Sequence, residues 1–175
     1  MQPRKSALST ASKYAIITAL AMFIFSIILY LTNMYLNQSI SWLSYAIMLA
    51  GLIFAVKDRR DKDLEGYISF GEAFKTGFLF CLVTGAIGTV FSLLMMKFIA
   101  PEMITEILKK AESDMINNGM PDEQIKMAME YTRRFTTPIW IAIWGLVGSA
   151  VIGAILSLIV AAVFKKESNQ LQQPQ

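Results

Sequence analysis

The chain has 175 residues, of which 55% are hydrophobic and 17% charged, with a mean hydropathy of +0.49. About a quarter of the residues in soluble domains are charged, so this composition excludes an ordinary soluble domain. The net charge of +3 is too small to indicate a nucleic-acid partner. The chain has no His and a single cysteine, Cys81. It therefore lacks the commonest general base and cannot form an intrachain disulfide or a thiolate metal cluster.

Three stretches without a charged residue predict membrane spans: residues 14–56, 76–96 and 135–164. A helix needs roughly 20 apolar residues to cross the hydrocarbon core of a bilayer. The first stretch is long enough for two crossings joined by a turn at its one polar cluster, Asn37-Gln38-Ser39. We therefore expect an all-α polytopic membrane protein with four transmembrane helices. The expected spans are residues 14–36, 41–56, 70–98 and 138–164, the second being the shortest.

The distribution of Lys and Arg predicts the orientation of the chain. Basic residues gather before the first span, in the charged run Lys57–Glu65 and after the last span, whereas the Asn37–Ile40 turn has none. Short flanks rich in Lys and Arg stay in the cytoplasm. Both termini are therefore expected to be cytoplasmic: an N-terminal tail of residues 1–13 and a polar, Gln-rich tail of residues 167–175, which we expect to be disordered.

The long segment between the third and fourth spans, residues 101–136, predicts an extracytoplasmic hairpin of two amphipathic helices. Asn118-Gly119 is typical of a helix end, and Pro121-Asp122-Glu123 is typical of a helix start. The apolar face of the second helix is expected to consist of Ile125, Ala128, Met129, Thr132 and Phe135. These apolar faces have two interpretations: they lie on the membrane or on the bundle, or they bind a partner.

Small residues recur every four positions along the last two spans. These candidate helix-packing residues are Gly77, Cys81 and Gly85 in the third span, and Gly145, Ser149, Gly153 and Ser157 in the fourth. Helices in a bilayer associate where small side chains let their backbones approach. We expect the third and fourth spans to pack together, and a homodimer through the fourth span is the alternative.

A polar cluster stands at the start of the third span. Ser69 and Glu72 have the spacing of a capping box, and Glu72 and Lys75 are placed to pair on one face of the helix. These roles are structural. In the functional alternative, Glu72 and Lys75 form a candidate functional pair in which Glu72 faces a water-filled cavity and binds a proton or cation.

Nothing in the sequence predicts catalysis. No carboxylate lies in the middle of a span, and there is no nucleophile elbow, phosphate-binding glycine loop or metal-ligand set. We expect a protein that is not an enzyme, with no catalytic residues, no cofactor and no metal site.

The segment Tyr67–Gly77 reads YISFGEAFKTG. It is similar to the signature of a family of small four-span Bacteroidota membrane proteins, domain of unknown function 4199. The resemblance extends from about Ser12 to Phe164, and it implies a location in the bacterial inner membrane. The family has no assigned activity and lends no catalytic residues. Its members are often encoded near a polyprenyl-phosphate glycosyltransferase, which implies an accessory subunit that positions such an enzyme.

Three functions remain as hypotheses. The first is a non-catalytic scaffold or accessory subunit of a membrane complex, which lies in the lipid bilayer and binds a protein partner through its exposed helices or its cytoplasmic loop. The second is a small oligomeric channel or transporter with Glu72 and Lys75 at its mouth, although no span carries a continuous polar stripe. The third is a homo-oligomer that organises lipid.

Overall fold

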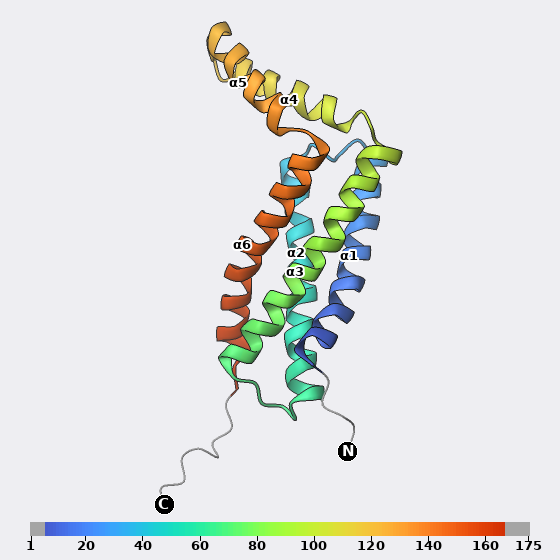
Figure 1. Cartoon of the computed structure of the whole chain (residues 1–175), viewed down its shortest axis with the longest axis vertical. Helices are drawn as coiled ribbons and strands as arrows, with labels where there is room; N and C mark the ends of the chain where they lie inside the picture. The colour runs from blue at the N-terminus through green and yellow to red at the C-terminus, as the bar shows by residue number, and fades with distance from the viewer. Residues whose placement is uncertain (1–5, 167–175) are drawn as a thin grey trace, which may run out of the picture. The chain divides into compact units, whose positions relative to one another are not determined.

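The structure is a computed structural model that describes residues 6–166, and every regular element in this range is a helix (Figure 1). The expected tail 167–175 and the first five residues lie outside the described residues. The elements are α1 (Ala7–Leu31), α2 (Gln38–Asp58), η1 (Arg59–Asp63), α3 (Phe70–Leu94), η2 (Met95–Ile99), α4 (Met103–Asn117), α5 (Asp122–Phe135) and α6 (Pro138–Phe164). Both η elements are wider π-type turns that continue the helix before them.

Three of these helices are long and apolar enough to cross a membrane. They are α1 with 25 residues, α3 together with η2 over Phe70–Ile99 with 30 residues, and α6 with 27 residues. The expectation of an all-α chain with membrane-length helices is confirmed to this extent. Helix α2 is not among the three, so the fourth span stays a prediction.

The ends of the first two helices differ from the sequence prediction. Helix α1 begins at Ala7, because the Ser6 hydroxyl accepts the Ser9 N–H at 3.2 Å, and it ends at Leu31 instead of residue 36. Helix α2 begins at Gln38 and continues through η1 to Asp63. Most of the charged run that reads as a loop is therefore helical. Ion pairs one turn apart, such as that of Asp58 with Lys62, stabilise it there.

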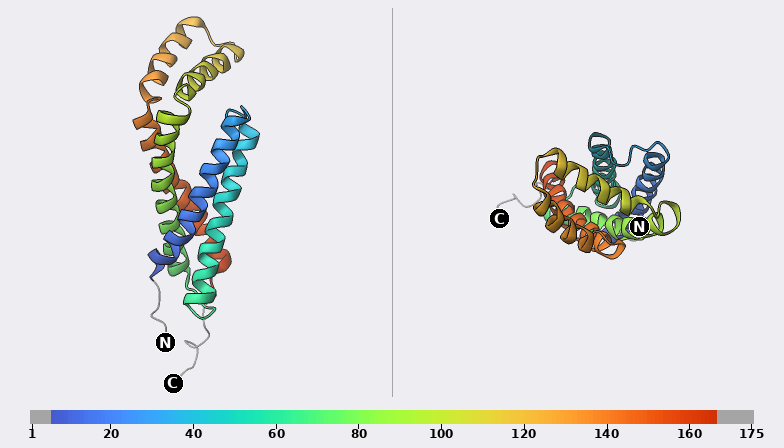
Figure 2. Two further views of the ribbon diagram at one scale, coloured as in Figure 1. Left: turned by 90° about the vertical axis from the view of Figure 1, so that its right-hand side faces the viewer. Right: turned by 90° about the horizontal axis from the view of Figure 1, so that it is seen from above.

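The chain forms two compact units, one of residues up to Gly88 together with those from Val147 onward, and one of residues Thr89–Leu146. In the first unit, α1 and α2 lie side by side and antiparallel (Figures 1 and 2). Their contact is close at Gly51 of α2, where any Cβ atom would collide with the side chain of Thr18 of α1. On the α1 side, Ala11 and Ala15 are fully buried.

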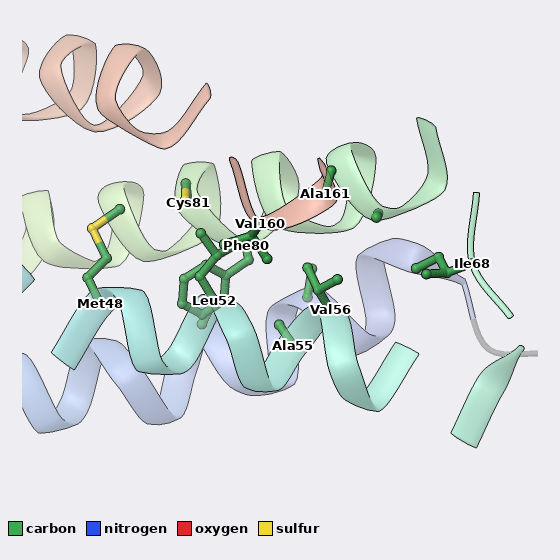
Figure 3. Packing of buried hydrophobic residues seen from close by; sticks show 12 residues of the cluster. Met48, Leu52, Ala55, Val56, Ile68, Phe80, Cys81, Val160 and Ala161 are labelled. Carbon is green, nitrogen blue, oxygen red and sulfur yellow. The ribbon is translucent and has the colours of Figure 1, made fainter. Parts of the chain in front are cut away.

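The core of this first unit draws on α1, α2, α3 and α6, and Figure 3 shows its packing. Leu52 and Val56 come from α2, Phe80 from α3, and Val160 with Ala161 from α6, and all are buried. This core fixes the helix ends that carry the candidate site.

The second unit contains the end of α3, then η2, α4 and α5, and the start of α6. Helices α4 and α5 lie side by side, joined by a turn in which Gly119 has φ +73° (Figure 1). Ile125 and Met129 of α5 are buried, as the expected apolar face requires. Phe135 differs, because it is exposed and packs edge-on against the ring of Trp140, with ring centroids 5.2 Å apart.

Candidate functional site

The start of α3 is fixed by its capping residue. The Ser69 hydroxyl accepts the backbone N–H of Glu72 at 3.3 Å, which satisfies one of the donors that the first turn of a helix leaves unpaired. The Ser69 half of the predicted capping box is therefore present. The cap aims the side chain of Glu72, on the first turn of α3, at the end of α2.

Glu72 binds Arg59, the first residue of η1. Arg59 Nη2 and Nε lie 2.7 and 3.2 Å from Glu72 Oε1, and Nη1 lies 3.4 Å from Asp63 Oδ2. Thr10 of α1 donates a hydrogen bond of 2.5 Å to the same Asp63 oxygen. We call these four residues the Arg59 cluster. It connects α1, η1 and α3 at one end of the first unit.

Burial explains why the cluster is built this way. Arg59 is only 6% exposed, and a buried charge is costly unless it is paired and hydrogen-bonded. Two carboxylates supply that compensation, and the hydroxyl of Thr10 occupies a further lone pair of Asp63. Both acids of the cluster serve as fixed acceptors for the guanidinium.

The sequence did not predict Arg59, and its expected pairing of Glu72 with Lys75 is not formed. In the described part of the chain the ion pair of Glu72 is with Arg59, and Lys75 is exposed. A signal for Arg59 was present. It follows Leu52, Ala55 and Val56 at helical spacing, so it shares the buried face of α2. The expected second span ends at residue 56, so Arg59 was left outside that buried face.

Two further residues of the signature segment Tyr67–Gly77, Ile68 and Thr76, are buried and form hydrogen bonds. Ile68 is buried and forms an antiparallel bridge with Lys166, with both N–H···O distances at 2.9 Å. The hydroxyl of Thr76 donates to the Glu72 carbonyl at 2.8 Å. The segment therefore links the start of α3 to the end of α2 and to the residues that follow α6.

The small-residue stripes meet over part of their length. A Cβ atom on Gly77 would lie 2.9 Å from Ser157 Oγ, and one on Gly153 would collide with Cys81. Cys81 Sγ and Ser157 Oγ are 4.0 Å apart. Helices α3 and α6 thus approach closely at these four residues.

Gly145, at the start of the stripe on α6, differs from these four residues. A Cβ atom on Gly145 would meet no described atom within 4 Å. Gly85 and Ser149 are partly buried farther along the same helices. Gly145 therefore lies outside the close approach.

Within residues 6–166, no three Asp, Glu or Cys side chains are grouped so that they could hold a metal ion. The carboxylates of the Arg59 cluster are occupied by a guanidinium and a hydroxyl. What the cluster does is hold three chain segments in fixed positions.

The family model described as "Protein of unknown function (DUF4199)" matches residues 13–166. The chain belongs to this family. The match to DUF4199 includes the signature segment, Arg59 and all the membrane-length helices except the first turns of α1. No curated protein and no solved structure matches the chain.

Proposed function

We propose that this DUF4199 protein crosses the bacterial inner membrane four times, with both termini in the cytoplasm and α4 and α5 outside. The fourth crossing is α2, whose 21 residues give a helix of about 31 Å at 1.5 Å per residue. Large apolar side chains of α2 are exposed, among them Leu43, Leu49 and Phe54. Lipid contact accounts for such side chains on a helix that carries no charge before Lys57.

Two contacts support a common side for both termini. Thr10, in the first turns of α1, binds Asp63, which follows α2. Ile68, before α3, pairs with Lys166, which follows α6. If α1 and α2 both cross the membrane, these contacts place the start of α1, the segment between α2 and α3, and the end of α6 at one surface. The Lys and Arg residues gathered there favour the cytoplasmic surface.

Within that membrane arrangement, the function we infer is that of a non-catalytic scaffold or accessory subunit which presents α5 to a partner protein. One observation carries this proposal: α5 has two apolar faces. Ile125 and Met129 are buried, whereas Met127 and Tyr131, on the other side of the helix, are 59% and 67% exposed. Phe135 extends the exposed stripe by one more turn. A helix that only covered α4 would need one apolar face.

Charge and residue type favour a protein as the occupant of the exposed stripe. Residues 100–136 carry seven acids against five bases, which disfavours docking on anionic lipid. Methionine adapts to irregular partner surfaces, and tyrosine is enriched where proteins meet. The family resemblance makes a polyprenyl-phosphate glycosyltransferase the first partner to test.

The test is purification from native membranes in a gentle detergent at normal expression. We expect a second protein in stoichiometric amount, and we expect Met127→Ser with Tyr131→Ser to lower its yield by about 10-fold or more, because buried aromatic anchors dominate interfaces. Glu130→Gln, an exposed polar position on the same helix, is the matched control and should keep the partner. Recovery of this chain alone, or equal recovery from both variants, contradicts the proposal.

The channel hypothesis loses its main support. It requires Glu72 to face a water-filled path, whereas Glu72 binds the buried Arg59. Reconstituted vesicles that conduct ions, and lose conduction with Glu72→Gln, would restore it.

A further inference from the structure

The end of the first unit that carries the Arg59 cluster also gathers basic residues distant in the sequence. Lys57 and Arg60 lie where α2 passes into η1, and Lys166 follows α6. The bridge between Ile68 and Lys166 holds these segments together. Arg60 also lies over the ring of Phe164, with its guanidinium carbon 5.7 Å from the ring centroid.

These three basic side chains surround a single carboxylate, that of Asp61. Arg60 Nε lies 2.7 Å from Asp61 Oδ1. The Arg60 hydrogen bond, together with attraction from Lys57 and Lys166, holds the pKa of Asp61 below its ordinary value. Asp61 balances one of these three positive charges. Lys57 and Lys166 are both exposed.

The position of these three basic residues indicates which ligand they bind. Phe164 is the last residue of α6, so the basic residues lie where this apolar helix ends. The Lys166 ammonium lies 5.3 Å from the centre of the Tyr67 ring, and aromatic rings beside Lys and Arg are typical of the headgroup layer of a membrane. At that depth the anionic groups are phosphodiesters of lipids.

We propose that Lys57, Arg60 and Lys166 form a binding site for the headgroup of an anionic phospholipid. Arg60 Nε and Nη2 already hold the Asp61 carboxylate, at 2.7 and 3.3 Å, so its Nη1 group and the two ammonium groups are the donors for the phosphate oxygens. Basic pockets between the cytoplasmic ends of membrane helices bind such headgroups. The proposal rests on the proposed placement of α6 across the membrane.

The test measures thermal unfolding of the full chain in dodecyl maltoside while dioleoyl phosphatidylglycerol or dioleoyl phosphatidylcholine is added. We expect phosphatidylglycerol alone to raise the unfolding temperature. The variant Lys57→Gln/Arg60→Gln/Lys166→Gln should need at least about 10-fold more phosphatidylglycerol for the same shift. The variant Lys57→Arg/Lys166→Arg keeps the charges and should respond as the native chain does.

The matched control is Lys109→Gln/Lys110→Gln/Lys126→Gln, which removes the same charge from α4 and α5 and should leave the response unchanged. Equal shifts with both lipids, an equal loss in the control, or an equal shift with inorganic phosphate alone would overturn the site. If the triple variant does not fold, the comparison of the two lipids on the native chain still tests the proposed site. Extraction of cell membranes with alkaline carbonate distinguishes a failure of the lipid site from a failure of the proposed function. Release of the chain by carbonate would contradict the membrane placement itself.

Discussion

Arg59 shows how a single charge can organise the end of a helical bundle. Its guanidinium is buried and makes contacts with Glu72 and Asp63, and Asp63 in turn accepts from Thr10. Removing one partner of a buried pair leaves an uncompensated charge, which costs more than the pair itself contributes. The cluster is therefore sensitive to loss of either carboxylate.

The substitution Glu72→Gln tests this sensitivity. It keeps the shape of the side chain but removes the charge that faces Arg59, so we expect a loss of about 2 kcal/mol in the free energy of unfolding. The measurement is equilibrium or thermal unfolding in a mild detergent. Lys75→Gln, three residues along the same helix and exposed, is the matched control and should change stability little. Equal losses of unfolding free energy from both substitutions would contradict this account and indicate that Glu72 pairs with Lys75.

At this scale the sequence predicted local interactions and missed the long-range one. The cap formed by Ser69 and the left-handed turn at Gly119 both follow from residues within three or four positions of each other. The contact between Arg59 and Glu72 crosses a connection whose path depends on η1, a π-type turn that no simple spacing indicates. The register of Arg59 with Leu52 and Val56 was the available signal.

At the scale of the elements, the approach of α3 to α6 depends on the absence of side chains. Cys81 lies so close to Gly153 that even one added methyl group must displace a helix. Lipid gives no hydrophobic reward for bringing the two helices together, so close packing has to supply the attraction. Small residues at the contact are therefore required, whereas at Gly145 a larger one has room.

Two alanine substitutions separate these positions. Gly153→Ala should destabilise the chain by about 1–3 kcal/mol through overpacking. Gly145→Ala, where the added Cβ meets nothing within 4 Å, should be close to neutral. Unfolding of both variants in detergent is the measurement, and combination of Gly153→Ala with Cys81→Gly should recover part of the loss because it removes the colliding atom.

A different result would assign the stripe on α6 to another contact. If Gly153→Ala left the unfolding of the chain unchanged but altered its oligomeric state, the small residues would serve a homodimer. Size-exclusion chromatography with light scattering distinguishes the two cases.

The elements themselves were predictable because apolar runs of more than 20 residues leave few alternatives to long helices. Their ends were less predictable. Charged residues from Lys57 to Asp63 read as a loop, yet pairs such as Asp58 with Lys62 and Arg59 with Asp63 lie one turn apart and extend α2. At a membrane surface, a charged helix end is as favourable as a loop.

At the scale of the whole molecule, the account depends on which solvent surrounds the helices. The outer faces of α1 and α6 carry large apolar side chains that are exposed in the chain alone, such as Ile24, Leu31, Ile155 and Val163. In water such surfaces would drive aggregation, whereas in a bilayer they are the ordinary surface of a span. The charged ends then define the two membrane surfaces.

The most direct test of this account uses three single-residue changes that place a thiol at exposed positions: Met34→Cys, Glu65→Cys and Asn118→Cys. Cells expressing each variant are treated with a membrane-impermeant maleimide before and after permeabilisation, with the buried native Cys81 serving as the background. The account predicts that positions 34 and 118 react in intact cells and position 65 only after permeabilisation. Reaction of positions 34 and 65 from the same side would show that α2 does not cross the membrane, and the four-span account would be wrong.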